Sequence, residues 1–88
     1  MTLKELCNEI AIDADVIDVY VWDESSEDYS FCFGFDTGSG DLGGDVLNLA
    51  RKDLEVQKCL GYEVRYMGIV VDDYRPVLRI EIEDTSVA

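Results

Sequence analysis

Apolar residues recur with two different periods along the chain, and each period predicts a different kind of element. Near the N-terminus they follow the i, i+3, i+4, i+7 spacing of one helix face: Leu3, Leu6, Cys7 and Ile10. Thr2, just before this stripe, and Glu5, three residues later, have the spacing of a capping box, in which each side chain accepts a hydrogen bond from the other residue's backbone N–H. The pattern predicts a short helix over residues 3–10.

Strict alternation then predicts a β-hairpin over residues 16–36. In its first strand three aliphatic residues point to one face and three polar or aromatic residues to the other: Ile17, Val19 and Val21 against Asp18, Tyr20 and Trp22. The second strand, residues 30–36, places Phe31, Phe33 and Phe35 on one face, which we expect to be core. An acidic turn over residues 24–28 joins the strands.

The second half of the chain predicts one more helix and two more strands. A glycine-rich break over residues 38–44 precedes Asp45, which we expect to cap a helix that ends at Gly61 or several residues earlier. Residues 62–71 and 77–83 are rich in β-formers, and residues 72–76 form the turn between them. Gly68 is the expected site of a β-bulge.

These elements predict an α+β fold with the order α-β-β-α-β-β. Two helices should lie on one face of a four-stranded, mainly antiparallel sheet, and the other face should be open to water or to a partner. The chain of 88 residues is expected to form a single domain over residues 1–88.

Charge is distributed unevenly along the chain, whose formal net charge is −13. Residues 1–50 carry twelve acidic residues and one basic residue, and no Lys or Arg lies between Glu5 and Ala50. Direct nucleic-acid binding is not expected, because affinity for phosphates comes from Lys and Arg. Anionic membranes should repel the chain for the same reason. A basic protein, in contrast, would be attracted and steered onto it.

The three cysteines, Cys7, Cys32 and Cys59, include no C-x-x-C pair, and the chain has no histidine. This pattern argues against a disulfide framework and a zinc site and favours reduced, buried thiols. The N-terminus lacks the features of a signal peptide, and the longest apolar run, residues 69–71, is too short to span a bilayer. We therefore expect a cytoplasmic protein.

The glycine-rich break has features of two kinds of ligand site. Residues 38–43 match the G-x-G-x-x-G pattern, but the preceding strand lies in a hairpin rather than a βαβ unit, so a dinucleotide is not expected. Asp36, Asp41 and Asp45 are weak candidates for a hard cation such as calcium or magnesium, and their spacing does not fit an EF-hand loop. No cofactor is predicted.

Catalysis is not expected either. Without histidine the chain has no Ser-His or Cys-His pair, and paired carboxylates are common in any acidic protein. We therefore predict that the protein is not an enzyme.

The most informative feature is the open sheet face, where aromatic and acidic residues should meet. Exposed Trp and Tyr are enriched at interfaces, since they supply buried area and a polar group. The predicted partner-binding residues are Asp18, Tyr20, Trp22, Asp23, Glu24, Glu27, Asp28, Glu81 and Glu83.

Carboxylates at i and i+2 of a strand lie about 6.7 Å apart, which is of the order of the phosphate spacing in nucleic acids. The acidic residues of the first half could therefore present an array that a nucleic-acid-binding protein treats as substrate. These residues are Asp13, Asp15, Asp18, Asp23, Glu24, Glu27, Asp28, Asp36, Asp41 and Asp45. The alternative is a generic acidic surface that keeps the protein soluble.

In size, charge, the capped opening Met1–Leu6 and the closing strand Val77–Glu83, the chain resembles small acidic α+β proteins encoded by phages and mobile elements. Anti-CRISPR proteins and other DNA-mimic inhibitors of host defence belong to this class. The resemblance implies a non-enzymatic inhibitor that occupies the basic nucleic-acid-binding site of a CRISPR-Cas-like nucleoprotein complex in the host cytoplasm. The alternatives are a homodimeric or assembly module that pairs through the open sheet face, and a weak metal-binding or small-ligand-binding domain.

Overall fold

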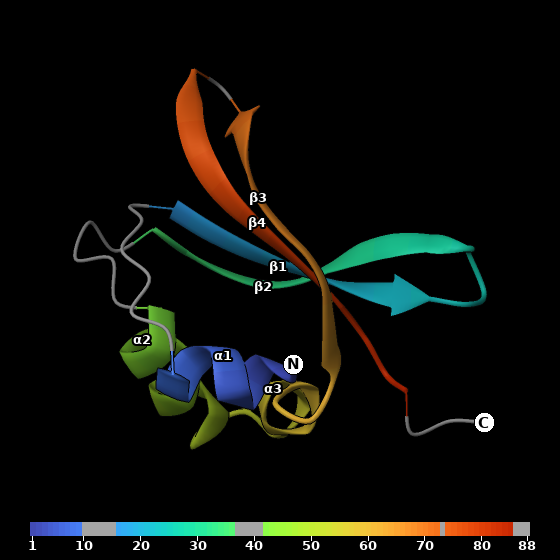
Figure 1. Cartoon of the computed structure of the whole chain (residues 1–88), viewed down its shortest axis with the longest axis vertical. Coiled ribbons are helices and arrows are strands. Elements are labelled where there is room, and N and C mark those ends of the chain that lie inside the picture. Colours follow the sequence, from blue (N-terminus) through green and yellow to red (C-terminus); the bar gives the residue numbers. More distant parts are fainter. Residues whose placement is uncertain (10–15, 37–41, 73, 86–88) are drawn as a thin grey trace.

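Four strands form one sheet in the order β2-β1-β4-β3, and helices lie on one side of it (Figure 1). This computed structural model describes residues 1–9, 16–36, 42–72 and 74–85. Its elements are α1 (Leu3–Glu9), β1 (Val16–Asp23), β2 (Asp28–Asp36), α2 (Leu42–Ala50), α3 (Leu54–Cys59), β3 (Glu63–Asp72) and β4 (Arg75–Glu83). The predicted α+β class and the four strands are confirmed.

The sheet is mixed rather than mainly antiparallel. β1 pairs with β2 and β3 pairs with β4 as antiparallel neighbours, but the central strands β1 and β4 run parallel. The helices α2 and α3 make the connection that allows this, because a helical crossover lets β3 start in the same direction as β2. β4 then necessarily runs in the same direction as β1.

The predicted cap of α1 is present. The Thr2 backbone N–H donates to Glu5 Oε1 at 3.0 Å, and the Glu5 backbone N–H donates to Thr2 Oγ1 at 3.2 Å. The next two backbone N–H groups, of Leu3 and Lys4, donate to the carbonyl oxygens of Tyr62 and Leu60 at 2.9 Å each. The start of α1 is thereby attached to the segment that leads from α3 into β3.

The single second helix that the sequence predicted is two helices in the structure, so the order is α-β-β-α-α-β-β. α2 already begins at Leu42, which puts Asp45 in its first turn rather than at its cap. The backbone N–H groups of Lys52 and Asp53 both donate to the Leu49 carbonyl at the end of α2. Asp53 then caps α3 by accepting the Glu55 N–H at 2.9 Å. The split therefore has a local cause, because the Asp53 carboxylate starts a new helix.

A β-bulge changes the face on which Phe31 lies. Phe33 pairs with Val19 and Phe31 pairs with Tyr20, so Cys32 is an extra residue between the two pairs. The extra residue reverses the alternation, which leaves Phe33 buried in the core and Phe31 58% exposed on the opposite face. The expectation that Phe31 belongs to the core was wrong, and the side chain of Phe35 lies outside the described residues.

The second bulge also differs from the prediction. The register shift in β3 lies between Val64 and Tyr66, so Arg65 is the extra residue and not Gly68. Gly68 has a different role, because the Tyr66 ring lies over it in the space that a Cβ would occupy. An aromatic ring that folds over a strand glycine covers the backbone and replaces the packing contacts that glycine cannot make.

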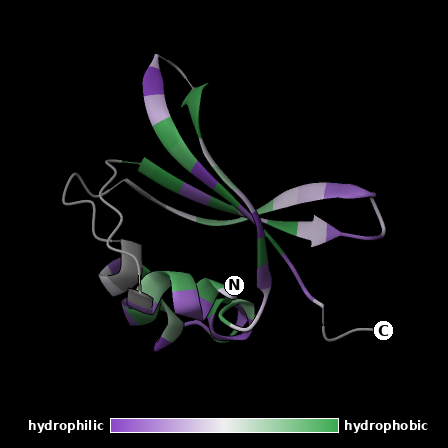
Figure 2. Ribbon diagram, in the orientation of Figure 1, coloured by the Kyte–Doolittle hydropathy of each residue, from purple (hydrophilic) through white to green (hydrophobic). Residues whose placement is uncertain are grey.

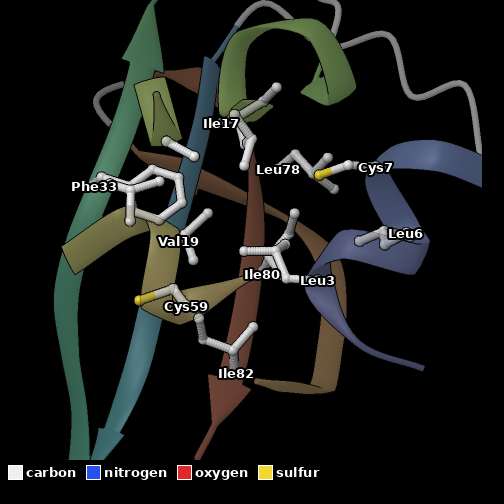
Figure 3. Close-up of a cluster of buried hydrophobic side chains, with 13 residues drawn as sticks. Leu3, Leu6, Cys7, Ile17, Val19, Phe33, Cys59, Leu78, Ile80 and Ile82 are labelled. Atoms are coloured by element: carbon white, nitrogen blue, oxygen red, sulfur yellow. The ribbon is translucent and has the colours of Figure 1, made fainter. Parts of the chain in front are cut away.

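The core lies between the helices and the face of the sheet that carries the aliphatic residues of β1 and β4 (Figure 3). Its fully buried side chains include Ile17, Val19, Ile80, Ile82, Leu3, Leu6 and Val46. Leu3 and Leu6 of α1 project toward Ile80 in Figure 3, as the predicted helix stripe requires. Figure 2 shows apolar residues in this layer and hydrophilic residues at the outer end of the β1–β2 hairpin. In the part of the chain that the structure describes, no helix has the length and apolar character needed to cross a membrane.

Two isoleucines of the β3–β4 pair that differ in burial, Ile80 and Ile69, test this assignment of the core. Ile80→Val should lower the free energy of unfolding by about 0.5–1.5 kcal/mol, because it leaves a methyl-sized gap in a fully buried site. Ile69→Val, at a position that is 62% exposed, should change it by less than about 0.5 kcal/mol. Urea denaturation measures both, and equal effects would contradict the described core.

Candidate functional site

The sheet face opposite the helices carries an ordered set of aromatic and charged side chains. The register of the four strands places Phe31, Tyr20, Glu81 and Tyr66 in one row across the sheet. The row before it contains Asp18 beside Arg79, and the row after it contains Trp22 beside Tyr29. We call this surface the open face. It unites the predicted residues Asp18, Tyr20, Trp22 and Glu81.

The centre of the open face is neutralised by an arginine of its own. The Arg79 guanidinium lies 3.8 Å from the centre of the Tyr20 ring, a cation–π contact. Arg79 Nε also donates to Glu81 Oε2 at 2.8 Å. Phe31 meets the Tyr20 ring edge-on, with the ring centroids 5.7 Å apart. The predicted negative charge of Glu81 is therefore compensated within the protein.

Two further predicted carboxylates on this face are also held by the fold. Glu83 Oε2 lies 3.3 Å from Nε of Arg65, the bulged residue of β3. Asp18 lies over Gly34, where a Cβ would come within 2.6 Å of its Oδ1 atom. Gly34 thus makes room for the Asp18 carboxylate beside Arg79. Sequence periodicity placed Asp18, Glu81 and Glu83 on the correct face, but it did not show their arginine neighbours.

The outer end of the open face is different, because the carboxylates of its turn have no arginine partner among the described residues. Trp22 packs edge-on against Tyr29, with the ring centroids 5.2 Å apart and the planes at 69°. Burial, and then the negative charges of Glu81 and Glu83, raise the pKa of the Tyr29 phenol. Two open pockets adjoin Trp22. One is lined by Trp22, Glu24 and Glu27, and the other by Trp22, Glu24, Glu83 and Asp84.

The turn that follows Trp22 holds four of the predicted acidic residues: Asp23, Glu24, Glu27 and Asp28. Asp23 Oδ1 accepts hydrogen bonds from the Ser25 hydroxyl at 2.7 Å and the Ser25 N–H at 3.0 Å. Asp28 Oδ1 accepts from the Tyr29 N–H at 2.7 Å, and Glu27 adopts a positive φ of 53°. Among the described residues, these four carboxylates form no ion pair with a Lys or Arg.

We call Trp22, Tyr29, the four turn carboxylates, Glu83 and Asp84 the hairpin-end site. It projects beyond the helices at the outer end of β1 and β2 (Figure 1). Sequence reasoning missed Tyr29 and Asp84 here and Phe31 on the open face. Tyr29 could have been found, since it faces Trp22 across the turn. Phe31 could be placed on the open face only once the β2 bulge was known. Asp84 could be placed at the hairpin-end site only once the path of the chain beyond β4 was known.

The acidic residues of the first half do not all gather on one surface. Asp45 lies on α2 in the helical layer, away from the hairpin-end site. Asp13, Asp15 and Asp41 lie outside the described residues, as does the side chain of Asp36, so most of the predicted cation site of Asp36, Asp41 and Asp45 lies outside them. Among the described residues, no group of three His, Cys, Asp or Glu side chains is placed to hold a metal ion.

Comparison of the chain with protein-family models, curated proteins and solved structures gives no match. The geometry of the open face and the hairpin-end site is therefore the basis for a proposed function.

The hydrogen bonds that the Asp23 carboxylate accepts predict a pKa shift that can be measured. The Ser25 hydroxyl, and then the Ser25 N–H, hold the pKa of Asp23 below its ordinary value of 3.8. Ser25→Ala should raise this pKa, and Ser26→Ala should raise it less, because Ser26 donates to the Asp23 carbonyl at 3.4 Å. Since the folded-state pKa is lowered, the stabilisation by Asp23 is present above the unfolded pKa and is lost as the pH falls through the folded one. NMR titration of the side-chain carboxyl carbons measures the shifts, and an unchanged Asp23 pKa in Ser25→Ala would refute the assignment.

Proposed function

We propose that the protein is a non-enzymatic binding domain that docks on a basic protein surface through the hairpin-end site. The observation that carries the proposal is the position of Trp22 beside two open pockets, in which every other lining residue that the structure describes is acidic. An aromatic ring beside carboxylates is the environment that an arginine or lysine side chain of a partner requires. The partner's cation would lie against the indole while its charge is balanced by Glu24 and its neighbours.

The energetics favour such a contact. Trp is the best aromatic acceptor for a cation, and the contact contributes about 0.5–1 kcal/mol at exposed sites and about 2 kcal/mol or more when water is excluded. The protein already uses this chemistry internally, where Arg79 lies over Tyr20. Glu81 forms an ion pair with Arg79, and Glu83 forms one with Arg65. The turn carboxylates are therefore the ones available to attract a partner.

Long-range charge supports the same function. The net charge of −13 and the absence of Lys and Arg between Glu5 and Ala50 give the hairpin a negative field. Such a field steers a basic partner toward the site and raises the association rate, an effect that weakens as salt is added.

The narrower form of the proposal is an inhibitor that mimics nucleic acid and occupies the basic channel of a CRISPR-Cas-like host defence complex. The four turn carboxylates and the resemblance to phage-encoded acidic inhibitors support it. Glu81 and Glu83 contribute less to a phosphate-like array than their spacing on β4 suggests, because each is paired with an arginine.

A second candidate is an assembly module that pairs through the open face. The exposure of Phe31, an apolar ring on the edge strand β2 of that face, favours it. Sedimentation over a range of concentrations at high salt tests this function, and a monomer throughout would exclude a homodimer.

The proposed function predicts that single substitutions at the hairpin-end site weaken binding of a labelled octaarginine peptide. Trp22→Leu should weaken it about tenfold, since it removes the cation–π surface, and Glu24→Gln about threefold to tenfold. Glu55→Gln makes the same charge change on α3, at an exposed side chain 4.0 Å from Lys58, and should alter the affinity less than twofold. Fluorescence anisotropy at low salt measures all three.

The outcomes separate the two levels of the proposal. Equal losses in Glu24→Gln and Glu55→Gln would show that only total charge matters and would refute the site. If the peptide binds as expected but the protein displaces no duplex DNA from CRISPR effector complexes, the mimicry is refuted while the basic-surface binding stands. If Trp22→Leu and Glu24→Gln still displace DNA as the wild-type protein does, the DNA-displacing activity does not belong to the hairpin-end site.

A further inference from the structure

Two cysteines that are 27 positions apart in the sequence meet between the sheet and the helices. Cys32 Sγ of β2 lies 3.7 Å from Cys59 Sγ, which belongs to the last residue of α3. Cys59 is buried, Cys32 is half-buried, and both are free thiols. Figure 3 shows the Cys59 sulfur pointing toward β2, whereas Cys7 belongs to α1 on the other side of the core. The fold thus singles out one pair among the three cysteines.

We propose that Cys32 and Cys59 are a redox modification site, in which a peroxide converts the two thiols into a disulfide that joins β2 to α3. The proposal is independent of the function of the hairpin-end site. The sulfurs lie within hydrogen-bond range, and a disulfide requires them to approach to about 2.05 Å, so closure needs a small displacement of two side chains.

The chemistry assigns a distinct role to each sulfur. Cys32 is the more accessible thiol, and the hydrogen bond with Cys59 lowers its pKa, which favours the nucleophilic thiolate. The same hydrogen bond, with burial, raises the pKa of the Cys59 thiol, so Cys59 retains its proton at this stage. Cys32 therefore attacks first and Cys59 resolves.

The reaction balances in two steps. The Cys32 thiolate attacks one oxygen of hydrogen peroxide, the O–O bond breaks, and the released hydroxide takes up a proton to form water, which leaves a sulfenic acid on Cys32. The Cys59 thiol then attacks that sulfur, the S–O bond breaks, and the Cys59 proton passes to the leaving hydroxide, which departs as a second water. In total two thiols and one peroxide give one disulfide and two waters.

The position of Cys32 gives this bond a structural consequence. Cys32 is the extra residue of the β2 bulge, and its neighbour Phe31 lies on the open face while Phe33 lies in the core. A bond to α3 would fix this bulge against the helical layer. It would also constrain the unfolded chain, because it closes a loop between residues 32 and 59.

The test treats the reduced full-length protein with hydrogen peroxide and counts the remaining thiols with a maleimide in denaturant. One cysteine should be labelled instead of three, and the protein mass should fall by two hydrogens. The urea midpoint, followed by Trp22 fluorescence, should rise on oxidation and return with dithiothreitol.

Three variants provide the controls. Cys7→Ser should still form the disulfide and leave no reactive thiol, whereas Cys32→Ser and Cys59→Ala should not lose two hydrogens. Cys32→Ser changes a half-buried position and is the primary variant if Cys59→Ala fails to fold. Three labelled cysteines after peroxide treatment of the wild-type protein, a disulfide that includes Cys7, or cross-linked dimers on a non-reducing gel would each overturn the proposal.

Discussion

The parallel contact between β1 and β4 is the constraint on which the rest of the structure depends. Each strand belongs to its own antiparallel hairpin, and only this pairing joins the two hairpins into one sheet. On one face it brings Ile17 and Val19 against Leu78 and Ile80, where the helices cover them. On the other face the same register sets Asp18 beside Arg79 and Tyr20 beside Glu81. The core and the open face are therefore two results of one strand alignment.

This alignment also determines where negative charge is available. The arginines that the sheet brings to the open face, Arg65 and Arg79, lie within ion-pair distance of Glu83 and Glu81. Repulsion within a chain of net charge −13 destabilises the compact state, and these pairs offset part of it on the open face. The turn beyond Trp22 has no such arginine among the described residues. Carboxylates without an arginine partner among the described residues therefore stand at the end of the hairpin, where the proposed function needs them.

The bulge at Cys32 links the two surfaces of the sheet. By adding one residue opposite β1 it turns Phe31 toward Tyr20 and leaves Phe33 in the core. It also puts the Cys32 sulfur within reach of Cys59 on α3. One irregular position thus shapes the aromatic surface, the packing of the core and the cysteine pair.

Local features of the sequence predicted the elements that depend on near neighbours. Thr2 and Glu5 are three residues apart and cap α1 without help from distant parts of the chain, and alternation places Ile17, Val19, Ile80 and Ile82 in the core. Alternation also assigned Asp18, Tyr20 and Trp22 to the open face, because side-chain direction in a regular strand has a period of two.

Features that depend on pairing between distant segments were decided by the tertiary structure. The bulge, the parallel contact of β1 with β4, the arginine partners of Glu81 and Glu83 and the meeting of Cys32 with Cys59 all require strand register or helix packing. Register is set by how the two hairpins bury their apolar faces together, and no single segment of the sequence contains that information.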